Sequence, residues 1–467
     1  MSRRTVAVVG GGVAGLAAAL EAGRAGARVV VLEAADRLGG KVRVSDVGGL
    51  PVDEGADSML ARVPYGVQLA EDAGLGPELV SPAAGSAGLW TRGRLRPLPG
   101  GTAMGIPGDL AQLARSEVLS PTGLARVPLD LALPGVGQAD DISVGALVAR
   151  RLGREVVDRL VDPLLGGVYA GSADRLSLHA TLPQLTAPVA RSRSLLLATR
   201  RAQATATPYA GPVFRGLPGG LGRLPAAVAT ASGAQVRLAT TVRALSRTPH
   251  GWRLELGSAA HPELLEVDAV VLAVPAAPAA RLLRDLAPAA AAELAGLEYA
   301  SVGIVTLVLD GPAPGTGSGY LVPALEGRTT KAVTFTSRKW AHYPGDRAVV
   351  RASVGRARET AELQRTDAEL VAIVRRELSA AVGPVGRLVD SRVVRWGGGL
   401  PQYAVGHLGL VARVHAAVAR HPGLAVAGAA YGGVGVPAVA RSGREAARQA
   451  LGAEWRHDRE RTDRQQA

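Results

Sequence analysis

Residues 5–33, TVAVVGGGVAGLAAALEAGRAGARVVVLE, determine the fold of the N-terminal part of the chain. Thr5–Val9 is a short apolar run of the length of a buried strand, and Arg28–Leu32 is a second one. Between them, apolar residues at helical spacing predict a helix from Val13 to Gly23. The stretch therefore reads as strand, turn, helix and strand, the unit from which parallel α/β sheets are built.

The turn of this unit has the glycine spacing of a dinucleotide-binding site. Gly10 permits the tight turn, Gly12 lets backbone N–H groups approach a pyrophosphate, and Gly15 lets helix and strand pack closely. The helix N-terminus attracts the phosphate charge. Glu33 is placed to accept hydrogen bonds from a ribose 2′-OH and would repel a 2′-phosphate, which favours FAD or NAD over NADP. The predicted contacts in this unit are Gly10, Gly11, Gly12, Val13, Ala14, Gly15, Glu33 and Ala34.

Composition excludes several classes of protein. With 467 residues, 47% of them hydrophobic, the chain is globular and long enough for about two or three domains. Cysteine is absent, which excludes disulfides, thiolate metal sites and a cysteinyl flavin bond, and the eight histidines lack metal-ligand spacing, so no metal is expected. No uninterrupted apolar stretch reaches 18 residues. We therefore expect a cytoplasmic protein with at most peripheral membrane contact.

The net charge of +13 has more than one explanation. A solvated basic surface is one, and an anionic small-molecule substrate or an anionic membrane surface are the functional ones. Binding of nucleic acid is not expected, because aromatic residues make up only 3% of the chain and no nucleic-acid module is present.

Two further segments extend the N-terminal unit. Residues 36–41, DRLGGK, bring two glycines beside the pyrophosphate, with Arg37, Lys41 and Arg43 as alternative cations to pair with it. Residues 52–58, VDEGADS, form a short extended segment. With Glu33, these segments resemble the FAD-dependent amine oxidase–protoporphyrinogen oxidase superfamily. The resemblance implies FAD, bound non-covalently, and adds as cofactor contacts Lys41, Gly55, Ala56, Asp57 and Ser58.

Residues 163–185, PLLGGVYAGSADRLSLHATLPQL, narrow the resemblance to bacterial porphyrinogen oxidases. From the residues alone, a helix ends at Gly166-Gly167, and Asp174 and Ser177 are possible helix caps. In the family, the Gly-Val-Tyr-Ala-Gly turn lies against the substrate cavity. That role is implied for Gly167 and Tyr169.

Other segments match the same family in the second half of the chain. Trp396, followed by LPQY at 400–403 and GH at 406–407, implies a tryptophan beside the flavin, and Val242 takes the position of the adenine contact. A glycine turn then opens a helix to Leu451, whose N-terminus in the family points at the flavin N1/C2=O edge. This adds Val434, Gly435 and Val436 as cofactor contacts.

Substrate contacts are less sharply indicated. In residues 336–340, TSRKW, Lys339 and Arg338 are candidates for meeting substrate carboxylates, with a solvated turn as an equal alternative. Arg62, just after the Asp57-Ser58 turn, is a further candidate. No side chain is predicted as a catalytic acid or base, because the flavin N5 carries the redox chemistry.

The predicted fold is α/β. A discontinuous Rossmann-like FAD-binding domain takes residues 1–62, 213–285 and 390–467, a helical region facing the substrate or the membrane takes 63–212, and an antiparallel substrate-binding sheet takes 286–389 with about 85–100. Expected elements include helices at Tyr65–Ala73, Ile142–Leu160 and Thr366–Val382, strands at Gln235–Val242 and Ala269–Pro275, a hairpin over Leu89–Leu98, and a solvated tail from Glu454.

The resemblance implies a six-electron oxidation of a porphyrinogen to a porphyrin in haem biosynthesis. Each of three rounds passes a hydride to flavin N5 while a pyrrole N–H loses its proton, and O2 reoxidises the flavin with release of H2O2. The basic charge favours coproporphyrinogen III, with four propionates, over protoporphyrinogen IX, with two. Downstream haem-pathway enzymes are possible partners.

Three other functions remain open. A flavin amine oxidase predicts an aromatic cage for its amine, a carotenoid desaturase predicts a long apolar channel, and a non-enzymatic FAD or NAD module predicts no turnover. The low aromatic content disfavours the first of them.

Overall fold

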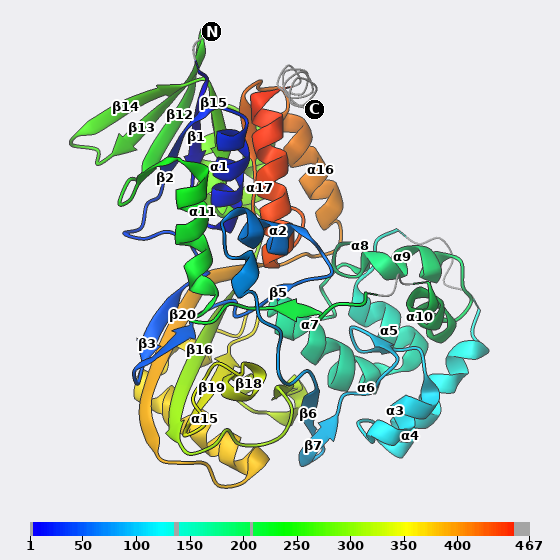
Figure 1. The fold of residues 1–467 in the computed structure, drawn as a ribbon. Coiled ribbons are helices and arrows are strands. Elements are labelled where there is room, and N and C mark those ends of the chain that lie inside the picture. Colours follow the sequence, from blue (N-terminus) through cyan, green and yellow to red (C-terminus); the bar gives the residue numbers. More distant parts are fainter. Residues whose placement is uncertain (1–2, 135–139, 206–208, 453–467) are drawn as a thin grey trace.

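The structure, a computed structural model, describes residues 3–134, 140–205 and 209–452, so the tail from Glu454 lies outside the described residues. The chain forms three lobes (Figure 1). One lobe is built on a parallel sheet, the second on a large antiparallel sheet, and the third consists of helices. The predicted α/β fold is confirmed.

A five-stranded parallel sheet is the centre of the first lobe. Its strands are apolar on both faces because helices or a second sheet cover each face. The strand order across the sheet is β11 (Gln235–Arg237), β2 (Arg28–Leu32), β1 (Thr5–Val9), β15 (Ala269–Leu272) and β21 (Leu424–Val426). The predicted strand Gln235–Val242 is therefore too long, because β11 ends at Arg237 and the chain then turns away into another sheet.

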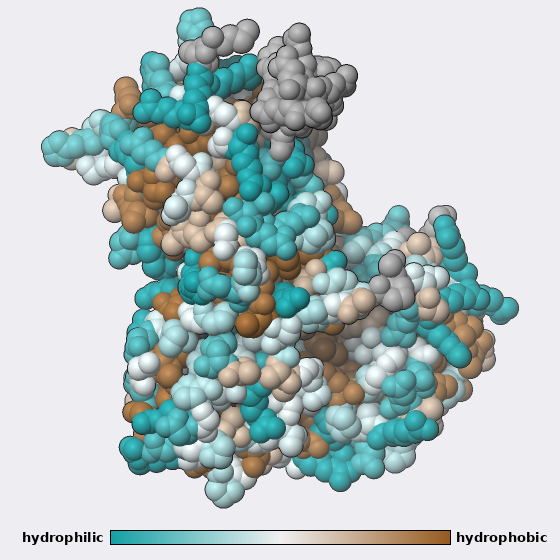
Figure 2. Space-filling view, in the orientation of Figure 1, coloured by the Kyte–Doolittle hydropathy of each residue, from teal (hydrophilic) through white to brown (hydrophobic). Residues whose placement is uncertain are grey.

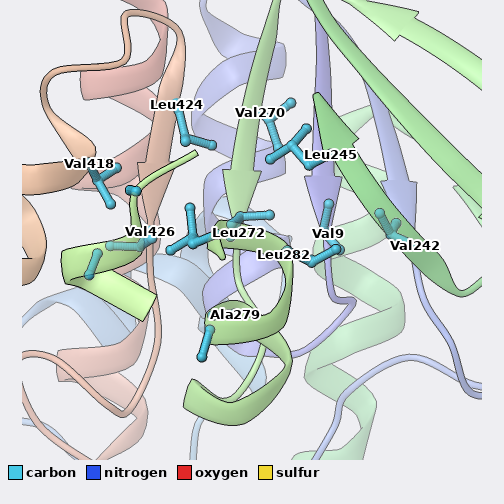
Figure 3. Close-up of a cluster of buried hydrophobic side chains, with 14 of the residues drawn as sticks. Val9, Val242, Leu245, Val270, Leu272, Ala279, Leu282, Val418, Leu424 and Val426 are labelled. Carbon is cyan, nitrogen blue, oxygen red and sulfur yellow. The ribbon is translucent and has the colours of Figure 1, made fainter. Parts of the chain in front are cut away.

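Two sets of elements cover this sheet. One face packs against α1 (Val13–Arg24) and α17 (Val436–Leu451). These helices cross closely, since a Cβ on Gly443 would lie 2.0 Å from the carbonyl oxygen of Ala14. Figure 3 shows the core on the other face, where side chains of the strands meet elements that are far away in sequence. Those elements are α12 (Ala276–Leu283), α13 (Pro288–Ala295), α16 (His407–Val418) and the three-stranded sheet of β12 (Val242–Thr248), β13 (Gly251–Gly257) and β14 (Pro262–Val267).

The second lobe is a seven-stranded sheet whose neighbouring strands are antiparallel except for β17 and β6. Helix α15 (Asp367–Val382) packs on one face and begins with a capping box between Thr366 and Glu369. The strand order is β20 (Leu388–Pro401), β16 (Tyr299–Asp310), β19 (Arg347–Val354), β18 (Thr330–Phe335), β17 (Gly319–Leu321), β6 (Ala87–Thr91) and β7 (Arg94–Pro97).

Strand β20 runs across the expected domain boundary at residue 390. Strand β20 pairs with β16 from Leu388 to Pro401, so this segment belongs to the antiparallel sheet, and the next element of the first lobe is α16. Strands β6 and β7, within residues 87–97, also belong to this sheet.

The third lobe contains α3 (Leu110–Ser116), α4 (Pro121–Arg126), α5 (Val144–Leu152), α6 (Arg154–Val156), α7 (Asp162–Tyr169), α8 (Leu178–Thr181), α9 (Pro183–Ala190) and α10 (Leu195–Ala204). The predicted helix Ile142–Leu160 is interrupted at Gly153, whose φ of 97° is incompatible with a continuous helix. Helix α7 does not stop at Gly166-Gly167 but continues to Tyr169. Ser177 caps α8 as predicted, whereas Asp174 instead forms an ion pair with Arg154.

Figure 2 shows a hollow lined by hydrophobic side chains, at the place where α7 meets the second lobe in Figure 1. Among the described residues, we find no helix with the length and hydropathy needed to cross a membrane.

Candidate active site

The three glycines of the β1–α1 turn occupy different surroundings. A Cβ on Gly10 would lie 2.6 Å from Ala273 O, and a Cβ on Gly15 would lie 1.9 Å from Gly10 O. Both positions therefore require a residue without a side chain for packing. A Cβ on Gly12 would meet no protein atom within 4 Å. Gly12 thus faces open space in front of the helix, as close approach of a phosphate requires.

Two helix N-termini open at this edge of the parallel sheet. Helix α1 follows β1 and helix α17 follows β21, and the N-cap residues Gly12 and Gly435 provide no side-chain acceptor. The first N–H groups of both helices are therefore available to an anionic ligand. The predicted contacts Val13, Ala14 and Gly15 lie in the first turn of α1, and Val434, Gly435 and Val436 lie at the start of α17.

A tyrosine fixes the turn that precedes α17. The Tyr403 hydroxyl accepts a hydrogen bond from the Gly433 N–H (2.7 Å) and donates one to the Ala429 carbonyl (2.6 Å). The same ring stacks on His407, with 3.9 Å between centroids and 15° between planes, and burial lowers the pKa of His407 to about 4. The LPQY…GH segment therefore holds the C-terminal glycine turn in place.

Glu33 lies at the carboxyl end of β2, where an adenosine ribose is expected. Its carboxylate accepts hydrogen bonds from the N–H groups of Gly11 (2.6 Å) and Ala35 (2.8 Å), and Ala34 lies between Glu33 and Ala35 in the sequence. The N–H of Thr240 donates to the carbonyl of Glu33 (2.8 Å). This bond brings Val242, the first residue of β12, to the same edge of the sheet.

The segments predicted to contact the flavin also lie close together. Gly39 pairs with Gly12 through the backbone, and its N–H donates to Gly11 O (2.8 Å). A Cβ on Gly55 would lie 2.0 Å from the carbonyl oxygen of Lys41 and 3.9 Å from the Trp396 ring. Trp396 Nε1 donates a hydrogen bond to the carbonyl of Glu54 (2.8 Å), the residue that precedes Gly55 and Ala56 in the sequence. Burial lowers the pKa of the Lys41 ammonium.

A buried ionic cluster follows these segments. Lys339 Nζ lies 3.0 Å from both carboxylate oxygens of Asp57 and 3.1 Å from the Ser58 hydroxyl. Arg351 Nη1 lies 3.5 Å from Asp57, and its Nη2 donates to Gly55 O (2.6 Å). Burial raises the pKa of Asp57, but the two cations outweigh burial and hold it at about 2.

Lys339 belongs to the short helix α14 (Thr336–Lys339), and its side chain is 15% exposed. The alternative of a solvated turn is therefore wrong for Lys339, whereas Arg338 in the same helix is exposed. A contact between Lys339 and substrate stays a prediction, because the ammonium is bonded to Asp57 here.

The predicted substrate residues Gly167 and Tyr169 both lie on α7. A Cβ on Gly167 would lie 3.6 Å from the side chain of Leu321 in β17. Tyr169 packs 5.5 Å from the Tyr403 ring, its carbonyl accepts from Gln402 Nε2 (2.8 Å), and burial raises its pKa to about 12.

Arg62 does not join this group through any bond among the described residues. It is exposed directly after β5 (Met59–Leu60) and stays a prediction.

A pocket of about 350 Å³ opens where the 163–185 segment meets the LPQY…GH segment. Its charged side chains are paired: Arg175 and Arg358 with Glu298, and Arg413 with Glu293. The 163–185 segment and the LPQY…GH segment therefore line the same pocket, whose charged side chains are bound in ion pairs.

Sequence reasoning missed Arg351, Tyr403 and Asp53 as site residues. Asp53 accepts hydrogen bonds from the N–H groups of Leu221 and Gly222, and burial raises its pKa to about 6. One signal was present: Arg351 interrupts the apolar run AVVRASV, where a cation needs a buried partner.

Residues 13–451 match the family described as flavin containing amine oxidoreductase. The chain belongs to this flavin-containing amine oxidoreductase family. It is therefore a flavin-binding oxidoreductase.

Relatives in this family align over almost the whole chain. The protein is 37% identical to the coproporphyrinogen III oxidase of Mycobacterium tuberculosis (strain H37Rv), covering 94% of this chain and 95% of that protein. It is 31% identical to the coproporphyrinogen III oxidase of Bacillus subtilis (strain 168), covering 96% and 98%. A solved structure of a proposed protoporphyrinogen oxidase from Exiguobacterium sp. 255-15 matches with a TM-score of 0.84 and 33% identity, covering 96% and 98%.

A Tyr403→Phe variant of this flavin oxidoreductase should bind flavin more weakly and be less stable. The substitution leaves the Gly433 N–H and the Ala429 carbonyl without their partner, which costs about 1–3 kcal/mol. Urea unfolding and titration of the apoprotein with FAD measure both effects. Tyr209→Phe, at an exposed tyrosine, is the matched control. Wild-type values for Tyr403→Phe would contradict the role assigned to the hydroxyl.

Proposed function

We propose that this protein is an FAD-dependent coproporphyrinogen III oxidase of haem biosynthesis, which forms coproporphyrin III and releases H2O2 from O2. The observation that carries the proposal is the 37% identity to a coproporphyrinogen III oxidase over 94% of the chain. An alignment of this length includes both the cofactor segments and the 163–185 segment beside the hollow.

FAD fits the residues that converge at the sheet edge. The glycine turn and the uncapped start of α1 suit a pyrophosphate, Glu33 suits the ribose, and the start of α17 suits the electron-rich edge of the ring. Absence of cysteine excludes a cysteinyl bond to the flavin. When bound, the flavin accepts the two electrons of each round and returns them to O2.

The chain itself provides position and shielding. Trp396 and Tyr403 hold the two backbone segments beside the predicted ring position through bonds to main-chain atoms. The buried aromatic rings of Tyr169 and Tyr403 exclude water on the side of α7. The substrate is expected to lie against Gly167 and Tyr169.

Protoporphyrinogen IX is the second candidate substrate, because the structure with a TM-score of 0.84 is that of a proposed protoporphyrinogen oxidase. The net charge of +13 favours the more anionic porphyrinogen.

Turnover of both porphyrinogens distinguishes the candidates. We expect kcat/KM to be higher for coproporphyrinogen III than for protoporphyrinogen IX, with three molecules of H2O2 released for each porphyrin formed. Porphyrin fluorescence and a coupled peroxidase assay provide the two measurements. Faster turnover of protoporphyrinogen IX would reverse the assignment, and oxidation of neither would remove it.

A further inference from the structure

Lys331 is a buried cation without an anionic partner. Lys331 lies in β18 and is 8% exposed. Among the described residues, no ion pair joins its ammonium to a carboxylate. Lys331 is also the extra residue of a β-bulge, since Thr330 pairs with Val354 whereas Ala332 already pairs with Ser353. A buried lysine in this situation costs stability unless an anion reaches it.

A second cation, the guanidinium of Arg356, lies close to Lys331. Arg356 follows β19, and its guanidinium donates to the carbonyl of Val322, beyond β17 (3.3 Å). The N–H of the same Val322 donates to the Lys331 carbonyl (2.8 Å). Because β18 lies between β19 and β17, the Arg356 side chain passes over β18 at Lys331. The two cations are thus neighbours, and the Arg356 charge, after burial, lowers the pKa of Lys331 to about 7.

This pair lies beside the predicted substrate turn. Strands β17 and β18 pack against α7, and the N–H of Ala357 donates to the carbonyl of Ala170, directly after Tyr169 (2.7 Å). Arg356 is also close to Asp162, the first residue of α7. Burial raises the pKa of Asp162, and the Arg356 charge opposes part of that rise. Arg358, two residues beyond Arg356, is by contrast neutralised by Glu298.

We propose that Lys331 and Arg356 bind a propionate carboxylate of the tetrapyrrole substrate. The assignment rests on the proposed function, which supplies an anionic occupant for a pair of buried cations at the α7–β17–β18 junction. A carboxylate placed there gains two charge-assisted hydrogen bonds and removes the repulsion between the cations. The carboxylate takes no part in the oxidation, so the pair contributes to binding and not to the redox step.

Lys331→Met provides a test that separates binding from folding. Methionine keeps an apolar chain of similar length and removes the charge, so we expect the variant to fold and to melt at a higher temperature than the wild type. The gain should be largest below about pH 7, where the folded wild-type protein carries the buried charge. It should shrink as the pH rises towards 10.5, because the folded wild-type protein then holds Lys331 neutral and the unfolded chain also loses the proton. Arg356 is the charged group that acts on Lys331, and Asp162 in turn acts on Arg356; both are unchanged in this variant.

The same variant should bind substrate poorly. We expect the KM for coproporphyrinogen III and the Kd for coproporphyrin III, measured by fluorescence quenching, to rise by about tenfold or more, while kcat stays near the wild-type value. Lys331→Arg should restore most of the affinity. Arg358→Gln, two residues from Arg356 but already paired with Glu298, is the matched control and should leave both constants unchanged.

The outcomes separate the two proposals. A wild-type protein that oxidises and binds the tetracarboxylate, together with an unchanged KM and Kd in Lys331→Met, would overturn the carboxylate site alone. A wild-type protein that neither oxidises nor binds it would overturn the proposed function and this site with it.

Discussion

A Gly12→Ala variant should fold like the wild type and yet be purified with little flavin. In the protein, a Cβ at this position meets no atom within 4 Å, so alanine brings no internal clash. A pyrophosphate in front of α1 would meet the added methyl group, and the overlap is expected to cost about 3 kcal/mol, or roughly a hundredfold in FAD affinity. The flavin-to-protein absorbance ratio, the Kd for FAD and the melting temperature of the apoprotein measure these effects.

Two other glycines are controls for this result. Gly85→Ala places a methyl group in open space at an exposed position and should change nothing. Gly15→Ala, whose Cβ would lie 1.9 Å from Gly10 O, should destabilise the protein itself. A Gly12→Ala variant with the wild-type flavin content would show that the cofactor does not approach this turn.

Asp57→Ala should be among the most destabilising single substitutions in the chain. It leaves Lys339 and Arg351 as buried cations without their shared anion, for which a loss of about 3–5 kcal/mol in the free energy of unfolding is expected. Urea unfolding at neutral pH measures the loss. In the wild type, the contribution of Asp57 is present above its ordinary pKa of 3.8 and is lost as the pH falls through about 2.

A second substitution checks the cause. Asp57→Ala combined with Lys339→Met removes one unpaired cation and should recover part of the stability, whereas Lys339→Met alone should be destabilising because Asp57 then loses its principal partner. A loss below about 1 kcal/mol for Asp57→Ala would contradict the role of this cluster as a bond between the first and second lobes.

The N-terminal unit was predictable because its determinants are local. Thr5–Val9 and Arg28–Leu32 are strands with the bounds read from their apolar runs, and the glycines between them lie within one turn. The partner of Lys339 was not predictable in this way. Asp57 lies 282 residues earlier in the chain, and no local pattern indicates which of many carboxylates a buried lysine meets.

Two departures from the sequence prediction have a common physical origin. Gly166-Gly167 has the local preference of a helix end, but a Cβ on Gly167 would lie 3.6 Å from Leu321, and tertiary packing carries α7 on to Tyr169. Similarly, residues 390–401 are predicted in the FAD-binding domain because they carry a family segment, yet strand pairing keeps them in β20 of the antiparallel sheet. In both cases long-range contacts decide the structure against a local signal.

Anaerobic mixing with coproporphyrinogen III tests the central claim most directly. In the absence of O2, the absorbance of the oxidised flavin should bleach within the time of a turnover, and readmission of O2 should restore it while coproporphyrin III and H2O2 form. A flavin that stays oxidised in the presence of coproporphyrinogen III would contradict the proposed function.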